Sequence, residues 1–208
     1  MKTKKEIIVN HNNLESSIDE LIRNGLEIVS DNFQINNQRN RIHKELLLES
    51  FLLRSCAYWE HFLEKEIILL VKLNPDTFKS YFNISVNFSL DHNLIRAILI
   101  GDKYQDWHDI QKFRSYFQKI IESKVNPFTK LTKEQLDLLN FVYILRNYLS
   151  HYSEYSKKKL FSMYKANYSY KKFIEPGSFL IKGKGKHFES LLHNFKLISV
   201  SIRKTLGV

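Results

Sequence analysis

The residues best suited to chemistry lie in one short segment, Arg146-Asn147-Tyr148-Leu149-Ser150-His151, at the end of a strongly apolar stretch. A histidine exchanges protons near neutral pH, and the guanidinium of an arginine binds phosphate through paired N–H groups. RNA cleavage removes a proton from the 2′-hydroxyl, delivers a proton to the leaving oxygen and must stabilise the charged phosphorane. Arg146 and His151 together offer much of this chemistry without a metal ion.

The spacing of these residues sets a geometric problem. On one continuous helix Asn147 and His151 share a face, whereas Arg146 and His151 lie about 140° apart around the axis. The long arginine side chain, or an unwinding near Ser150, would have to bring them together. One Arg–His pair is also a sparse active site, which a two-fold dimer would complete. Alternatively, these residues only neutralise carbonyls at a helix end.

A further polar residue, Glu60, interrupts an apolar helical stripe that includes Cys56 and Leu63. A carboxylate in such a stripe is costly unless it is paired. We expect an arginine such as Arg146 to be its partner, which Glu60 would then orient. The alternative is a solvated carboxylate at the edge of the stripe.

Basic and aromatic residues follow His151 directly. Tyr152 precedes the run Lys157-Lys158-Lys159, and Tyr155 and Tyr164 lie close by in the chain. Lysines bind a nucleic-acid backbone and tyrosine rings stack on bases, so this segment is a candidate RNA-binding surface. A solvated basic loop explains the same residues.

The composition favours a helical protein with a polyanionic partner. The chain has 208 residues, 43% hydrophobic and 26% charged, which is typical of one folded domain and excludes a disordered or fibrous chain. Only 6 glycines and 3 prolines are present, few for the many turns of an all-β fold. The formal net charge of +10 favours RNA, DNA or an acidic membrane surface as partner, or serves solubility alone.

The chain shows no sign of an oxidising or membrane environment. Cys56 is the single cysteine, so no internal disulfide can form. The chain begins with basic residues followed by only three apolar residues, too few for a signal-peptide core. No uncharged apolar run reaches the length of about 18 residues that a membrane span needs. We expect a cytoplasmic protein that does not contact membranes. The histidines show no metal-ligand spacing, so we expect no metal or other cofactor.

Apolar residues recur every three or four positions over several segments, which predicts an all-α helical bundle. We expect residues 1–13 to be a flexible N-terminus and residues 14–208 to form one domain. Pro75 ends a long helix, and Thr132 with Gln135 has the pattern of a capping box. The main helices are expected over residues 14–30, 39–72, 107–123, 132–151 and 187–206.

The segments between these helices are less regular. Residues 32–40 are expected to be a connecting loop, and residues 75–106 a partly helical insertion after the long helix. A short strand at 178–181, followed by a basic turn at Gly183 and Gly185, would give one short hairpin before the last helix.

The segment from Arg146 to His151 resembles the R-x4-6-H motif of HEPN domains, in which a polar residue often follows the arginine. The run Leu52–Leu63, which contains Trp59 and Glu60, is similar to the aromatic–glutamate segment of the RiboL-PSP-like branch. The resemblance covers roughly residues 40–205. It implies a helical bundle and, as in many HEPN domains, a metal-independent endoribonuclease that dimerises so that two motifs meet.

The resemblance also implies a role for each residue. Arg146 would bind and stabilise the scissile phosphate, and His151 would act as general acid or base. Asn147 would orient this pair, and Glu60 would support Arg146. The products would carry a 2′,3′-cyclic phosphate or its opened form. HEPN proteins occur in bacterial toxin–antitoxin and antiphage defence systems, which implies an antitoxin or defence-system protein as a further partner.

Two other functions remain open at this point. A non-catalytic helical module that binds RNA or a partner protein would use the basic surface and would not need His151. A DNA-binding regulator is the third possibility, although no helix-turn-helix spacing is evident.

Overall fold

A computed structural model describes residues 2–30, 40–85, 90–101 and 110–207 of the chain. These residues form nine α-helices and one 3₁₀-helix, and no strand occurs among them, which confirms the predicted all-α bundle. The elements are α1 (Lys2–Val29), α2 (Asn40–Leu73), α3 (Asp76–Tyr81), α4 (His92–Ile100), α5 (Ile110–Ile120), η2 (Pro127–Lys130), α6 (Lys133–His151), α7 (Glu154–Tyr168), α8 (Pro176–Leu180) and α9 (Lys186–Leu206).

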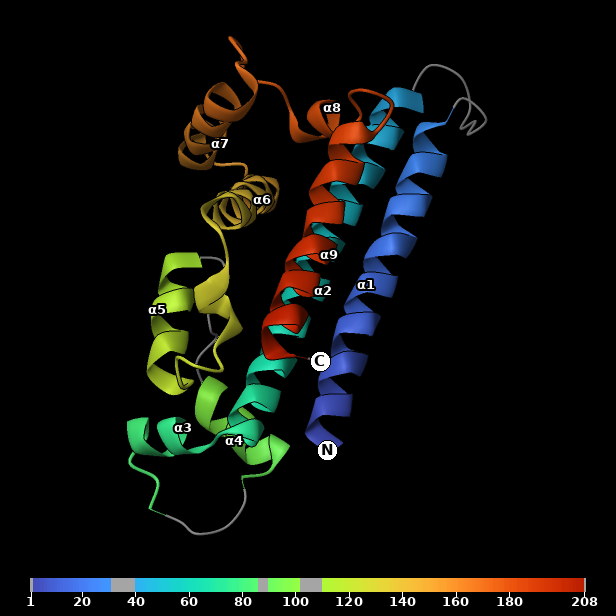
Figure 1. The fold of residues 1–208 in the computed structure, drawn as a ribbon. Helices are drawn as coiled ribbons and strands as arrows, with labels where there is room; N and C mark the ends of the chain where they lie inside the picture. Colours follow the sequence, from blue (N-terminus) through green and yellow to red (C-terminus); the bar gives the residue numbers. More distant parts are fainter. Residues whose placement is uncertain (1, 31–39, 86–89, 102–109, 208) are drawn as a thin grey trace.

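Three long helices, α1, α2 and α9, run side by side and form the spine of the molecule (Figure 1). The helices α3 and α4 lie near one end of this spine, α5 lies beside its middle, and α6 and α7 lie toward its other end (Figure 1). None of the described helices has the length and apolar character needed to cross a membrane.

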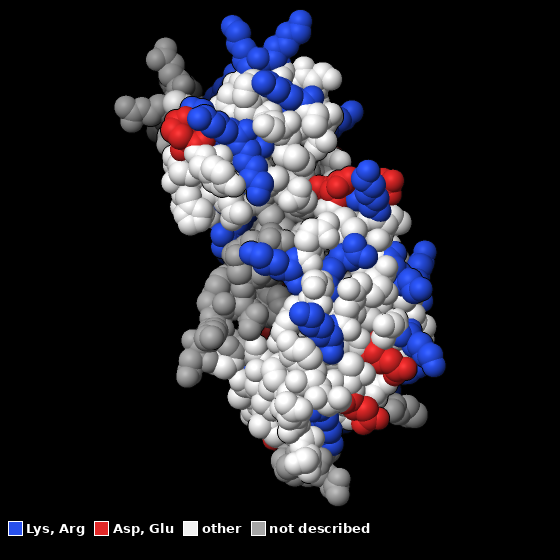
Figure 2. All heavy atoms as spheres, turned by 90° about the vertical axis from the view of Figure 1, so that its left-hand side faces the viewer, with Lys and Arg blue, Asp and Glu red and all other residues white. Residues whose placement is uncertain are grey.

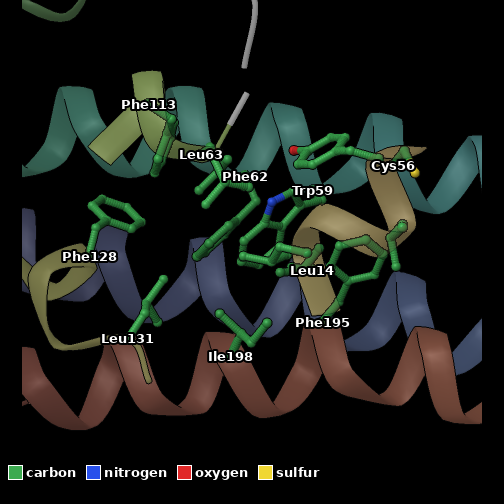
Figure 3. Packing of buried hydrophobic residues seen from close by; sticks show 14 of the residues in the cluster. Leu14, Cys56, Trp59, Phe62, Leu63, Phe113, Phe128, Leu131, Phe195 and Ile198 are labelled. Atoms are coloured by element: carbon green, nitrogen blue, oxygen red, sulfur yellow. The ribbon is translucent and has the colours of Figure 1, made fainter. Parts of the chain in front are cut away.

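Helix α2 is the centre of the core. From Glu66 to Val71 every residue is buried, which is expected of a helix with neighbours on all sides. Trp59 stacks on Phe195 of α9 with ring centroids 5.2 Å apart, and Phe62 lies beside Trp59 at 5.3 Å (Figure 3). Aromatic packing of this kind joins α2 to α9 over a large apolar area.

A buried polar network also joins the three spine helices. Asn10 Nδ2 donates to Glu66 Oε2 at 2.9 Å, and His11 Nε2 lies 3.3 Å from Glu66 Oε1. His11 Nδ1 is 2.7 Å from Ser199 Oγ, so the network passes from α2 through α1 to α9. His11, Glu66 and Ser199 are fully buried, so each depends on these partners for its hydrogen bonds.

The prediction of a flexible N-terminus over residues 1–13 is wrong, because α1 begins at Lys2. Ile7 and His11 are both 0% exposed and continue the buried stripe of Leu14 and Ile18 toward the chain start. This segment is rich in lysine, so its apolar residues did not indicate a helix from the sequence alone. Burial against α2 holds the segment in the helix.

The predicted strand at 178–181 is also wrong. Pro176 starts the short helix α8, a position where its missing N–H costs nothing. The backbone N–H of Gly177 donates to Glu49 Oε1 at 2.6 Å, and a Cβ at Gly177 would lie 2.5 Å from that of Glu45. This close approach seats α8 on α2, so Phe179 and Leu180 are buried as helix residues.

The strongest local predictions are confirmed. The long helix ends at Leu73, just before Pro75, and the last helix covers Lys186–Leu206. Thr132 and Gln135 form the expected capping box, with Gln135 Oε1 accepting from the Thr132 N–H at 2.9 Å. The expected loop at 32–40 and the expected helix start at Trp107 lie almost wholly outside the described residues.

We predict that Gly25→Ala destabilises the protein. Alanine normally favours a helix over glycine by about 1 kcal/mol, but a Cβ at Gly25 would overlap the ring of Phe188 on α9. Overpacking of this kind costs about 1–3 kcal/mol. The free energy of unfolding in urea, followed by circular dichroism, should therefore fall for Gly25→Ala. The exposed Ser16→Ala in the same helix should not lower it, and a stabilised Gly25→Ala would contradict the close α1–α9 packing.

We predict that Glu66→Ala lowers the free energy of unfolding by about 3 kcal/mol, because it leaves the buried Asn10 and His11 donors without their acceptor. Glu64→Ala is the matched control on the same helix. Its ion pair with Arg96 is partly exposed, so its loss should cost less than about 1 kcal/mol. Equal losses for the two variants would show that the network does not stabilise the spine.

Candidate functional site

The candidate site lies at the corner between α6 and α7. Helix α6 runs without interruption to His151, so the unwinding near Ser150 that the spacing allowed does not occur. Tyr152 adopts a left-handed conformation (φ 46°), and its N–H donates to the Tyr148 carbonyl at 2.8 Å, which ends the helix. Ser153 then caps α7 by accepting from the N–H of Ser156 at 3.2 Å.

This tight corner encloses a cavity of about 300 Å³. Arg146, Asn147 and His151 of α6 line one side of it, and Lys159 of α7 lines the other. Four further residues complete the lining: Ile144, Ser153, Tyr155 and Ser156. The cavity therefore brings together the three α6 residues singled out from the sequence, although Arg146 and His151 lie on different faces of the helix.

The groups of the cavity are arranged to receive an anion. Arg146 and Asn147 are half-buried, and Arg146 Nη1 donates to Asn147 Oδ1 at 3.3 Å, which orients the guanidinium. His151 is exposed at the helix end, so a ligand can reach its ring. The lining contains Arg146, Lys159 and His151 but no carboxylate. A phosphate would meet positive charge and N–H donors there.

Glu60 is half-buried on α2 and does not line the cavity. No ion pair between Glu60 and Arg146 is present among the described residues. The pKa of the Cys56 thiol is raised to about 12, chiefly by burial and also by the Glu60 carboxylate, whereas the Arg146 guanidinium acts to lower it. Glu60 and Arg146 therefore both lie near this buried thiol.

The two tyrosines at the corner differ in their surroundings. Tyr152 is 60% exposed but does not line the cavity, and its ring lies 5.1 Å from that of Tyr148. The Tyr148 hydroxyl donates to Glu175 Oε2 at 2.9 Å; burial and this carboxylate raise the pKa of Tyr148. Tyr152 thus packs beside Tyr148 and its partner Glu175 and does not face into the cavity.

The lysine run at 157–159 belongs to helix α7, so the interpretation as a loop is wrong. Its three members have different environments. Lys157 lies over the Phe173 ring at 5.0 Å, Lys158 is exposed and Lys159 reaches the cavity. Tyr164, a candidate for base stacking, is 0% exposed and therefore cannot contact a ligand.

Positive charge is concentrated in the part of the sequence that follows the cavity residues of α6. Residues 157–186 contain nine lysines and one acidic residue, Glu175, which accounts for +8 of the net charge of +10. Figure 2 views the molecule from the side of α5, α6 and α7, and Lys and Arg side chains are frequent toward the end where α7 lies. Sequence reasoning missed this concentration, although the near absence of acidic residues over this segment was visible.

Two other arrangements of side chains do not form a site. No group of three or more His, Cys, Asp or Glu side chains in the described residues converges as a metal site would. The chain Ser199–His11–Glu66 has the residue types of a hydrolase triad, but Ser199 is fully buried and no substrate could reach it. The cavity at the α6–α7 corner remains the best candidate. Sequence reasoning also missed Ser153 and Ser156 as lining residues.

Comparison of the whole chain with protein-family models, with curated proteins and with solved structures found no match.

We predict that Cys56 is unreactive in the folded protein. A thiol whose pKa is about 12 carries almost no thiolate at pH 8, and burial blocks access to it. A disulfide reagent such as DTNB should label Cys56 only after unfolding. The unfolded thiol has a pKa of about 8.5. The folded state therefore holds this proton more tightly, and the free energy of unfolding falls as the pH rises from about 8.5 to about 12. Cys56→Ala should lack that part of the loss, whereas rapid labelling of the native protein would contradict the burial.

Proposed function

We propose that this protein is a metal-independent endoribonuclease of the HEPN type, and that the cavity at the α6–α7 corner is its active site. The observation that carries the proposal is that Arg146, Asn147 and His151 line one cavity together with Lys159 and with no acidic residue. This lining combines a proton-transfer group with donors for a charged phosphate.

In the proposed reaction the scissile phosphate binds in the cavity against the Arg146 guanidinium, which Asn147 orients. The 2′-hydroxyl loses its proton and its oxygen attacks phosphorus, while the bond from phosphorus to the 5′-oxygen breaks. The 5′-oxygen takes up a proton as it leaves. The products are a 2′,3′-cyclic phosphate and a 5′-hydroxyl. Arg146 and Lys159 stabilise the negative charge of the phosphorane.

This reaction needs both a base and an acid, and each cavity contains one histidine. His151 takes one of these roles. We propose that a homodimer supplies the other from the second copy of the same motif, because His151 is exposed at the end of α6 where a second protomer can approach. Glu60 acts as a positioning residue for Arg146 in this proposal, because both side chains lie close enough to Cys56 to affect the pKa of its thiol.

The proposed cellular role is RNA cleavage in the cytoplasm for antiphage defence or growth arrest, under the control of an antitoxin or another defence-system protein. The concentration of lysines over residues 157–186 supports RNA as the partner. The same concentration supports a second candidate function. A non-catalytic RNA-binding module would use these lysines without any role for His151.

Cleavage assays with purified protein and total RNA or transfer RNA, in EDTA, separate these two functions. We predict that the wild type produces fragments with 2′,3′-cyclic phosphate ends. His151→Ala should reduce the rate at least about 100-fold, because proton transfer by a placed side chain contributes at least this factor. His151 is exposed, so the thermal unfolding curve should change little.

His193→Ala is the matched control, since His193 is an exposed histidine on α9 that does not line the cavity. It should cut RNA at the wild-type rate. Equal rates for His151→Ala and the wild type would refute the assignment of the site. Salt-sensitive RNA binding without cleavage by any variant would support the non-catalytic module instead.

A further inference from the structure

Helix α7 presents an exposed stripe that begins at the cavity. Tyr155, Lys158, Lys159 and Lys165 are exposed and lie within one side of the helix, since residues three, four and seven positions apart share a face. We call these four residues the α7 stripe. The opposite side carries Leu160 and Tyr164, which are both 0% exposed and attach α7 to the core.

Tyr155 stands at the cavity end of the α7 stripe. It is 78% exposed, lines the cavity, and has no hydrogen bond or ring contact with any described residue. Tyr152 differs because its ring already lies against that of Tyr148. Tyr155 therefore offers a free aromatic face within reach of any group bound beside Arg146 and His151.

The lysines of the stripe continue from this ring along the helix. Lys158 and Lys165 are separated by about 10 Å along the axis at a rise of about 1.5 Å per residue. Neither forms an ion pair among the described residues, and Lys165 lies over the Phe161 ring at 4.3 Å, which holds its ammonium at the surface. Glu154, at the very start of α7, is its one acidic residue.

We propose that RNA bound in the cavity continues along the α7 stripe, with Tyr155 stacking on the base next to the phosphate that Arg146 holds. Lys158 and Lys165 bind the phosphates that follow. A base can stack on Tyr155 only if it leaves its neighbours, so Tyr155 selects an unpaired nucleotide at this position. This inference rests on the proposed function for the position of the scissile phosphate.

The test measures binding separately from cleavage. A short RNA that carries 2-aminopurine at one position at a time is titrated into His151→Ala protein. Stacking on Tyr155 should quench the fluorescence at one position, and adding Tyr155→Ala should abolish this quenching and weaken binding about tenfold. Tyr155→Phe keeps the ring and should retain both. Tyr81→Ala, which removes another exposed tyrosine on α3, should change neither.

The lysines are tested by the salt dependence of binding. Lys158→Ala should weaken binding and reduce the slope of log affinity against log salt by about one, as expected for one lost phosphate contact. Lys4→Ala is the matched control, because Lys4 is an exposed lysine on α1. Equal slopes for Lys158→Ala and Lys4→Ala would overturn the phosphate track along α7.

The outcomes distinguish the α7 stripe from the proposed function. If the wild type does not cut RNA but Tyr155→Ala abolishes the quenching, the stripe is supported and the nuclease proposal fails. If the wild type cuts RNA and Tyr155→Ala binds and quenches as the His151→Ala parent does, the stripe is overturned and the nuclease proposal stands.

Discussion

The carboxylate of Glu66 holds the spine of the molecule together. It begins the run of α2 from Glu66 to Val71 in which every residue is buried, and it accepts a hydrogen bond from Asn10 and lies against His11 of α1. His11 in turn reaches Ser199 of α9. Apolar side chains can pack in more than one register, but a buried carboxylate without its donors is very costly. The network therefore fixes how the three long helices are aligned.

The site depends on this alignment through α6. Helix α6 packs on α2, α7 and α9, and its residues Leu145, Tyr148 and Leu149 are buried. Arg146 and Asn147, which lie between them in the chain, are half-buried, and His151 at the helix end is exposed. The left-handed conformation of Tyr152 turns the chain, and α7 begins two residues later at Glu154. Residues of α7 therefore line the same cavity as Arg146, Asn147 and His151. One helix end and one helix start thus enclose the cavity without any unwinding.

Local signals were readable from the sequence, and long-range partners were not. Pro75 and the Thr132 cap mark helix ends through their own backbone chemistry, so α2 and α6 were predicted well. The start of α1 and the short helix α8 depend on burial against α2, which no local pattern expresses. The same limit applies to the site. Residue types and spacing singled out Arg146 and His151. Helical periodicity does not show which side chains meet across helices, and no Glu60–Arg146 ion pair is present among the described residues.

The distribution of charge favours a ligand over solubility as the reason for the basic composition. A protein that needs only solubility can spread its charge over the surface, whereas here residues 157–186 carry +8 and the rest of the chain only +2. Like charges held this close repel one another and destabilise the fold. The carboxylates Glu45, Glu49 and Glu175 do not line the cavity, and burial raises the pKa of Glu49, with Glu45 and Glu175 also raising it. A bound polyanion would relieve the repulsion among the lysines of this segment.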